Sequence, residues 1–112
     1  ARLREVFKEA SFDAIVSFQT IESIADDRKF LDDLKELLRP GGLLLIDTPI
    51  RKHRVDHPEN HNHKRYYGLD EWLEMLSSRF EVEVFDALPE AAFLKACQLP
   101  SQGSIVVCRK AG

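Results

Sequence analysis

The stretch that most constrains the fold spans residues 12–49 and reads FDAIVSFQTIESIADDRKFLDDLKELLRPGGLLLIDTP. It contains two short, mostly apolar runs, Phe12–Phe18 and Leu43–Ile46. Strands that are apolar on consecutive positions are covered on both faces, which is typical of parallel sheets. A strand, a crossover helix and a parallel strand form a right-handed unit. The stretch therefore predicts a parallel βαβ unit within an α/β fold.

The segment between the two runs has the apolar spacing of an amphipathic helix, predicted at about Asp27–Leu38. Its apolar stripe consists of Phe30, Leu31, Leu34, Leu37 and Leu38. Asp26 or Asp27 can cap the start, because a carboxylate accepts from free backbone N–H groups there. The sequence Arg39-Pro40-Gly41-Gly42 ends the helix, since the residue before proline avoids the helical region and glycine allows a tight turn.

The second half of the chain predicts one further helix and two strands. The helix is expected at Leu69–Ser78, whose apolar residues share one face. Phe80–Phe85 alternates between apolar and acidic residues, which indicates an edge strand or an antiparallel pair, and we do not expect it to run parallel to Leu43–Ile46. Ser104–Arg109 is the last strand, and Leu88–Gly103 has room for one turn of helix.

Length and composition favour a single globular domain, 1–112, in a reducing compartment. The net charge of −3 argues against a general nucleic-acid binder. No apolar run approaches the length of a membrane span and no signal-peptide pattern opens the chain. Cys97 and Cys108 form no metal-like pair. We therefore expect a cytoplasmic protein that binds neither nucleic acid nor membrane.

Two stretches resemble the class I S-adenosylmethionine-dependent methyltransferases. FDAIVSFQTIESI…FLDDLKELLRPGGLLLIDTP is similar to the fourth strand, the next helix, the L-(K/R)-P-G-G turn and the fifth strand of that fold. HNHKRYYGLDEWLEMLSSRFEVEVF is similar to the stretch where many members have a His, an aromatic residue, a helix that opens with acidic residues, and a phenylalanine before the sixth strand. The resemblance covers nearly the whole chain.

The resemblance implies a partial Rossmann-like, three-layer fold with a mixed sheet. In that topology the last strand inserts antiparallel between the second and third strands, so the spatial order is first, second, fourth, third. The family's glycine-rich cofactor motif is absent, because the first glycine of the chain is Gly41. The chain thus resembles the C-terminal part of the fold, and we expect either a fragment or a shortened protein.

The resemblance also implies a site for S-adenosylmethionine at the end of the first strand. The cofactor-binding candidates are Phe18, Gln19, Thr20 and Glu22, and Ser23 stands where a His is common in the family. Alternatively, Gln19 and Thr20 only cap a turn, and Glu22 is solvated or pairs locally. Because the glycine-rich motif is missing, we expect the chain alone to bind S-adenosylmethionine weakly or not at all.

The end of the second strand, with Thr48 and Pro49, is expected to contact the substrate, although Asp47 and Thr48 can equally satisfy backbone groups in a turn. The polar stretch 51–67 follows and holds all four histidines. Such a cluster suggests a metal site, but the spacing is broken by Pro58 and we predict none.

The family pattern of a His followed by an aromatic residue matches His63 and Tyr66. His63 is therefore the candidate catalytic base and, with Tyr66, a candidate substrate contact. The cations of this stretch can attract an anionic substrate; they are Arg51, Lys52, Arg54, Lys64 and Arg65. The alternative is that the stretch is a mobile, solvated loop.

Two classes of function remain open at this stage. The first is the transfer of a methyl group to an unidentified small-molecule acceptor, and the second is a non-catalytic binding or assembly module with the same fold. Another nucleotide-binding α/β enzyme matches the later segments less well. A strand–glycine–helix segment upstream of Ala1 would discriminate the first two. We also expect that strand Phe12–Phe18 is an open edge, through which the chain self-associates unless Ala1–Ser11 covers it.

Overall fold

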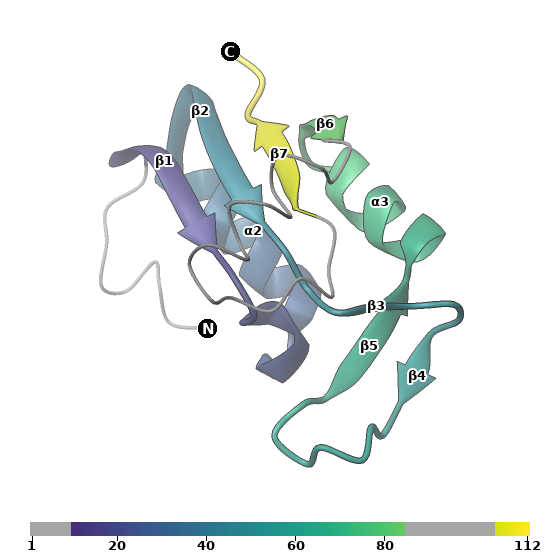
Figure 1. Cartoon of the computed structure of the whole chain (residues 1–112). Helices are drawn as coiled ribbons and strands as arrows, with labels where there is room; N and C mark the ends of the chain where they lie inside the picture. Colours follow the sequence, from purple (N-terminus) through teal and green to yellow (C-terminus); the bar gives the residue numbers. More distant parts are fainter. Residues whose placement is uncertain (1–9, 85–104) are drawn as a thin grey trace, which may run out of the picture.

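The computed structural model describes residues 10–84 and 105–112 and contains two small sheets and two α-helices (Figure 1). The elements are, in chain order, β1 (Phe12–Ser17), the 3-10 helix η1 (Ile21–Ser23), α2 (Asp27–Leu37), β2 (Leu38–Ile46), β3 (Ile50–Arg51), β4 (Val55–Asp56), β5 (Arg65–Gly68), α3 (Leu69–Ser77), β6 (Glu81–Val84) and β7 (Val106–Arg109). The part of the chain predicted as one turn of helix, Leu88–Gly103, lies outside the described residues.

The main sheet has the strand order β1-β2-β7-β6. β1 pairs with β2 in parallel, and β7 is antiparallel to both β2 and β6. This confirms the predicted βαβ unit, the mixed sheet and the insertion of the last strand. The expectation that the third strand would not run parallel to Leu43–Ile46 is wrong, because β2 and β6 are both antiparallel to β7 and therefore share one direction. Alternation between apolar and acidic residues indicates that one face of a strand is exposed, and it carries no information about the direction of that strand.

Strand β2 begins at Leu38, which is earlier than the apolar run Leu43–Ile46 suggests. Leu38 already has extended dihedrals, φ −77° and ψ 141°, and its chain continues through the glycines as part of β2. Gly41 adopts φ +77°, a conformation that favours glycine. A Cβ on Gly42 would lie 2.8 Å from the carbonyl oxygen of Arg39 and 3.0 Å from that of Asp13. The glycine pair therefore lets β1 and β2 approach at the start of their pairing.

The core lies on one face of the main sheet. Leu44, Ile46, Val106 and Cys108 are buried there, while the residues that alternate with them on β2 and β7 are only partly buried. Helices α2 and α3 contribute the other side chains of this cluster, including Leu31, Leu34, Trp72 and Leu76. The predicted apolar stripes of both helices are thus the faces that pack. At the N-terminus of α2, Asp26 provides the predicted cap and accepts from the Lys29 N–H at 3.1 Å.

The second sheet was not foreseen from the sequence. β5 pairs in parallel with β3 and antiparallel with β4, so most of the polar stretch 51–67 forms a hairpin-like extension beyond the main sheet (Figure 1). Strands of two to four residues are too short to show a period of two in sequence. Most residues between positions 52 and 64 are exposed, as the alternative of a solvated loop expected, and β4 and β5 give part of the stretch regular structure. No helix within residues 10–84 and 105–112 is long and apolar enough to cross a membrane.

Candidate functional site

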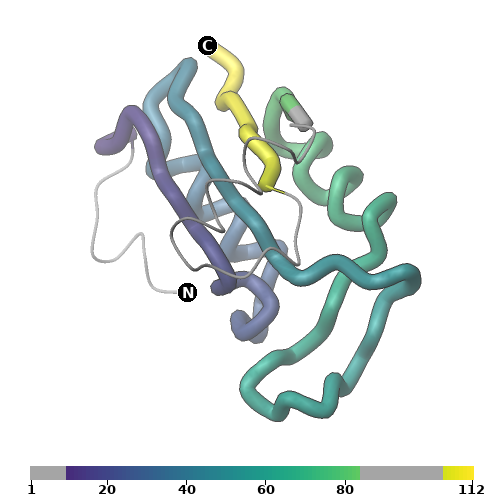
Figure 2. Tube along the Cα trace, viewed as in Figure 1, coloured from purple at the N-terminus to yellow at the C-terminus, as the bar shows by residue number. Residues whose placement is uncertain are grey.

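The carboxyl ends of β1 and β2 leave the sheet side by side, and two residues clamp them together (Figure 2). Gln19 adopts φ +52°, and its backbone N–H donates to Oδ1 of Asp47 at 2.8 Å. The Gln19 side-chain amide reaches Oδ2 of the same carboxylate at 3.3 Å, and the Asp47 N–H donates to the Ser17 carbonyl at 3.1 Å. These contacts give the loop after β1 one defined conformation at the edge where ligands of α/β sheets bind.

Asp47 is 2% exposed, and burial raises its pKa above the usual value of 3.8, while the hydrogen bonds from Gln19 partly oppose this rise. From the sequence, Asp47 is expected either at the strand end that faces the substrate or as a residue that satisfies backbone groups in a turn, and its bond from the Gln19 N–H fits the second of these. A carboxylate directly after an apolar strand is the sequence signal for such a clamp, but its partner in the chain cannot be identified from the sequence.

Glu22 and Thr48 form a second link between the two strand ends. Glu22 is fully buried, and its Oε1 accepts from the Thr48 hydroxyl at 2.9 Å. Its Oε2 has no hydrogen-bond partner among the described residues, which is unusual for a buried carboxylate oxygen. The alternative of a solvated Glu22 is therefore wrong, while the alternative of local pairing fits its bond to Thr48. Pro49 is also buried.

The other cofactor candidates line the same turn. Phe18, Gln19 and Thr20 are half-buried, and the Thr20 hydroxyl donates to the Phe18 carbonyl at 2.9 Å. Thr20 therefore supports the turn, as the capping alternative proposed. The polar groups of Gln19 and Thr20 therefore mainly stabilise the conformation of the loop, and few of their hydrogen-bond donors are left free to bind a ligand.

Arg65 fastens the second sheet to this region. Its side chain is buried and donates to the carbonyl oxygens of Ile21, Ile24 and Ala25 at 3.2, 2.5 and 2.9 Å. Its Nε lies 3.8 Å from the Asp27 carboxylate. In addition, the Lys64 N–H donates to the Glu22 carbonyl at 2.6 Å. Arg65 is thus a structural anchor, and it also lines a pocket on this side of the small sheet.

His63 and Tyr66, which the family resemblance singled out, are in direct contact. Nδ1 of His63 lies 2.6 Å from the Tyr66 hydroxyl oxygen, and the rings pack edge to face with centroids 5.3 Å apart. The guanidinium of Arg51 lies over the Tyr66 ring, 4.5 Å from its centroid. The imidazole, the phenol and the guanidinium therefore form one contiguous cluster beside the second sheet.

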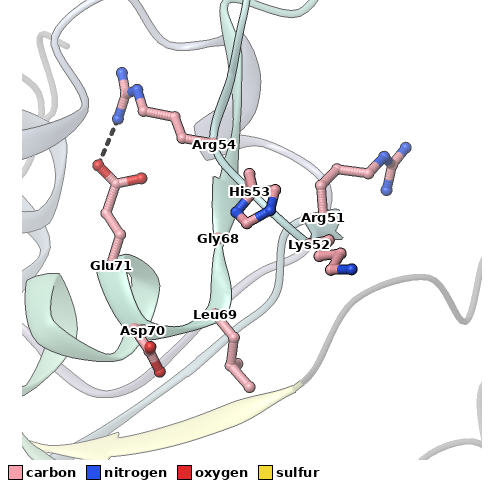
Figure 3. Close-up of a pocket in the computed structure, with 8 residues that line it drawn as sticks. All are labelled: Arg51, Lys52, His53, Arg54, Gly68, Leu69, Asp70 and Glu71. Atoms are coloured by element: carbon pink, nitrogen blue, oxygen red, sulfur yellow. Dashed lines mark hydrogen bonds and ion pairs between the residues drawn. The ribbon is translucent and has the colours of Figure 1, made fainter.

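Two pockets lie beside this cluster of His63, Tyr66 and Arg51. One, of about 390 Å³, lies between the β3–β4 turn and the start of α3 (Figure 3). Its walls carry four basic side chains, Arg51, Lys52, His53 and Arg54, but also Asp70 and Glu71. In Figure 3, Arg54 reaches towards Glu71, with which it forms a 2.6 Å ion pair, whereas Arg51 extends away from it. Arg54 also pairs with Asp56 at 2.9 Å, so its charge is compensated.

The second pocket, of about 600 Å³, lies between the loop before β5 and the turn before α2. Its polar lining consists of His57, His61, His63, Lys64 and Arg65. Within residues 10–84 and 105–112, no three His, Cys, Asp or Glu side chains are arranged to hold a metal ion. All four histidines lie in one stretch of the sequence, but in the fold His53 lines the first pocket and the other three line the second.

Comparisons with known proteins agree with this architecture. Residues 3–85 match the family described as "Methyltransferase domain". The chain is 35% identical over 102 residues to a probable S-adenosylmethionine-dependent methyltransferase of Mycolicibacterium smegmatis, covering 88% of this chain and 40% of that protein. The chain thus spans less than half the length of this relative.

Solved structures of similar fold share little sequence with the chain. The CurJ carbon methyltransferase superposes with a TM-score of 0.66 at 18% identity, over 96% of this chain and 31% of that one. The [4+2]-cyclase SpnF gives 0.66 at 16% identity, over 94% and 53%. A Burkholderia thailandensis N1-methyltransferase, solved with 1,6-didemethyltoxoflavin and S-adenosylhomocysteine, gives 0.59 at 17%, over 98% and 48%. Together with the family match, the strand order and the paired strand ends, these findings show that the chain belongs to the class I S-adenosylmethionine-dependent methyltransferase family.

Proposed function

We propose that this chain forms the acceptor side of an S-adenosylmethionine-dependent methyltransferase that acts on a small molecule. The observation that carries the proposal is the convergence of two linked strand ends, Gln19–Asp47 and Glu22–Thr48, beside the His63–Tyr66 pair. Parallel strands that end together create the crevice in which α/β enzymes bind their ligands. In this proposal Thr48, Pro49, His63 and Tyr66 contact the acceptor.

The residues of the first turn fit one side of the cofactor. Phe18, Gln19 and Thr20 are half-buried at the end of β1, where side chains can contact a bound ligand without leaving the core. Glu22 adds a buried carboxylate oxygen that has no partner among the described residues. When bound, S-adenosylmethionine supplies an activated methyl group on a sulfonium. The protein mainly positions the reactants and excludes water, which agrees with the absence of a fixed triad in the sequence.

His63 is proposed to take the proton that the acceptor releases as its nucleophilic atom is methylated. This role requires the neutral tautomer whose Nδ1–H donates to the Tyr66 hydroxyl oxygen, because Nε2 then keeps its lone pair. Tyr66 is a positioning residue in this scheme, since it fixes the tautomer and the ring orientation of His63. The stacked Arg51 guanidinium favours a rigid Tyr66 ring.

The alternative is a non-catalytic binding or assembly module. It is favoured by the internal hydrogen bonds of Gln19 and Thr20, which leave few free donors at the predicted cofactor turn. The similarity to a [4+2]-cyclase also illustrates that this fold hosts more than one function. This alternative predicts specific ligand or protein binding without release of S-adenosylhomocysteine.

The experiment uses the longest natural polypeptide that carries this sequence, incubated with S-adenosylmethionine and a small-molecule extract, with S-adenosylhomocysteine as the readout. We expect turnover that H63Q lowers by about 100-fold, the usual size of a general-base contribution. Y66F should shift the pH profile of kcat and lower it less, because the imidazole remains. H53Q is the matched control, since His53 is an exposed histidine on the other pocket and should leave the rate unchanged.

Calorimetry on the same variants separates binding from chemistry. H63Q should bind S-adenosylmethionine as the unchanged protein does. Equal rates for H63Q and H53Q would remove His63 from the catalytic role. A polypeptide that binds S-adenosylmethionine but releases no S-adenosylhomocysteine with any acceptor fraction would favour the non-catalytic module.

A further inference from the structure

The pocket before β5 differs from its neighbour in the charge of its walls. Its polar lining contains three imidazoles, one ammonium and one guanidinium, and no carboxylate of the described part of the chain lines it. In the β3–β4 pocket of Figure 3, by contrast, Asp70 and Glu71 belong to the lining together with the basic side chains, and Arg54 is paired with two carboxylates. A ligand in the pocket before β5 therefore meets hydrogen-bond donors and positive charge in its lining.

Several acidic groups bonded to the lining residues or close to them in sequence are already engaged, among them Asp56 beside His57, which pairs with Arg54 at 2.9 Å. Arg65 lies 3.8 Å from Asp27, whose carboxylate also accepts from the Tyr67 hydroxyl at 2.7 Å. Glu22 is buried against Thr48, and Asp26 caps α2. Another acid of the loop, Glu59, is exposed and does not line the pocket. The positive charge at the pocket mouth thus comes chiefly from Lys64, with the three imidazoles adding charge when they are protonated.

The loop that carries the histidines has a defined shape. Asn60 closes a turn, because its carbonyl accepts from the His63 N–H at 2.9 Å and its side chain accepts from the Asn62 N–H at 3.0 Å. His57 adopts φ +57°, an uncommon conformation for a residue with a Cβ. Strained residues of this kind cluster at ligand sites, where the surrounding structure holds them in place. The imidazoles are therefore presented from a pre-organised turn.

We propose that this pocket, with His57, His61 and Lys64, binds an oxyanion of the methyl acceptor, either a tetrahedral phosphate or sulfate group or a carboxylate. The inference rests on the proposed function, because His63 lines the same pocket and is the base of that proposal. An acceptor anchored here by its anionic group would present a neighbouring nucleophilic atom to His63. Neutral imidazoles donate one N–H each, and protonated ones donate two, so binding should strengthen as pH falls.

The test measures oxyanion binding directly by NMR titration of the isotope-labelled 112-residue chain with sodium sulfate. Sulfate keeps the same charge between pH 6 and pH 8, so any change of affinity across about two pH units, which span the usual imidazole titration, belongs to the protein. We expect saturable shifts of the His57, His61 and Lys64 signals and tighter binding at pH 6. Sodium acetate is the second arm, and the tighter of the two probes identifies tetrahedral or carboxylate recognition.

The variants are chosen among exposed residues, so that they fold as the unchanged chain does. K64Q should weaken binding by about fivefold, as expected for loss of one exposed charge. H57Q/H61Q should reduce the pH dependence, because only His63 then remains of the three imidazoles that line the pocket. K52Q is the matched control, because it removes a lysine from the other basic pocket, and its affinity should be unchanged.

Three results would overturn the inference: shifts that do not saturate, the same shifts with sodium chloride at equal ionic strength, or equal losses in K64Q and K52Q. None of these readouts depends on methyl transfer. A protein that releases S-adenosylhomocysteine but binds no oxyanion here would therefore keep the proposed function and lose this inference.

Discussion

Single residues at the strand ends and at the tight turn carry energetic consequences that can be measured. Asp47 is buried between the ends of β1 and β2, and burial raises its pKa above 3.8. The folded chain therefore binds the proton of the Asp47 carboxyl group more tightly than the unfolded chain does. The stabilisation is fully present below the unfolded pKa and is lost as pH rises through the folded pKa.

D47N tests this sign. The amide that replaces the carboxylate keeps an oxygen that can accept from the Gln19 N–H, but it carries no charge to desolvate. The free energy of unfolding of the unchanged chain minus that of D47N should decrease as pH rises above about 4, the usual carboxylate range. Urea unfolding between pH 3 and pH 7 provides the measurement, because the upper limit lies about three units above the usual carboxylate pKa. Parallel curves for the two chains would contradict the raised pKa.

The two glycines of the turn before the apolar part of β2 should respond differently to alanine. G42A places a Cβ within 3.0 Å of two backbone oxygens and should cost about 2–3 kcal/mol of unfolding free energy, as overpacking does. G41A meets no atom within 4 Å but is strained by its φ of +77°, and it should cost about 1 kcal/mol. Denaturant unfolding measures both. G41N is the matched control and should be tolerated better than G41A, because asparagine enters this conformation more readily; the opposite order of G41A and G42A would refute the argument.

At the scale of elements, one side chain holds the small sheet to the main one. Arg65 on β5 donates to three carbonyl oxygens around η1 and the start of α2. R65Q should therefore lower the unfolding free energy by about 3 kcal/mol, since hydrogen bonds to a charged group are lost and buried carbonyls remain unpaired. R65K should give an intermediate loss, because lysine keeps the charge but not the planar fork.

The neighbouring variant K64Q is the control for R65Q and should change stability by less than about 0.5 kcal/mol, as exposed substitutions do. Amide exchange then locates the effect. Faster exchange in β4 and β5, with β1 and β2 unchanged, is the expected pattern. A uniform increase throughout the main sheet would mean that Arg65 supports the whole domain and not the small sheet.

β1 lies at one end of the strand order in the part of the chain that the structure describes, and its Val16 is 59% exposed. Strand edges that carry little charge recruit other strands. We expect the 112-residue chain to self-associate through this edge, unless residues 1–11 cover it. V16E should reduce association in light scattering, whereas L69E, at the other exposed large apolar residue among those described, should not. A strict monomer whose Ala14–Phe18 amides exchange as in an unfolded peptide would rule out both forms of this prediction.

At the scale of the whole molecule, the function proposed above gives the chain the acceptor side of the crevice, and its sequence has no glycine-rich turn. The first glycine, Gly41, lies at the opposite end of β2 from Asp47. We therefore expect the 112-residue chain to bind S-adenosylmethionine no more tightly than in the millimolar range by calorimetry. The longest natural polypeptide that carries the sequence is the matched comparison. Micromolar affinity of the 112-residue chain would show that the half-buried turn at Phe18–Thr20 suffices to hold the cofactor.

By itself, the sequence determined the elements whose signals are local. Consecutive apolar residues predicted β1 and β2, the helical stripes predicted α2 and α3 to within one residue, and Asp26 marked the helix start. The family resemblance supplied the strand order, and it also singled out His63 and Tyr66, a pair that the fold places in contact. The helices, the strands and the helix cap depend on neighbours a few positions apart, whose geometry the backbone period sets.

The tertiary structure alone decided the contacts between distant positions. Glu22 and Thr48 are 26 residues apart, and Arg65 reaches carbonyls 40 or more residues away. The three short strands of the second sheet also arise from such contacts, since isolated pairs of two to four residues are not stable on their own. Burial and partner choice depend on how the elements pack, and no periodicity along the chain encodes them. That is why Arg65 read as a surface cation in the sequence but is an anchor in the fold.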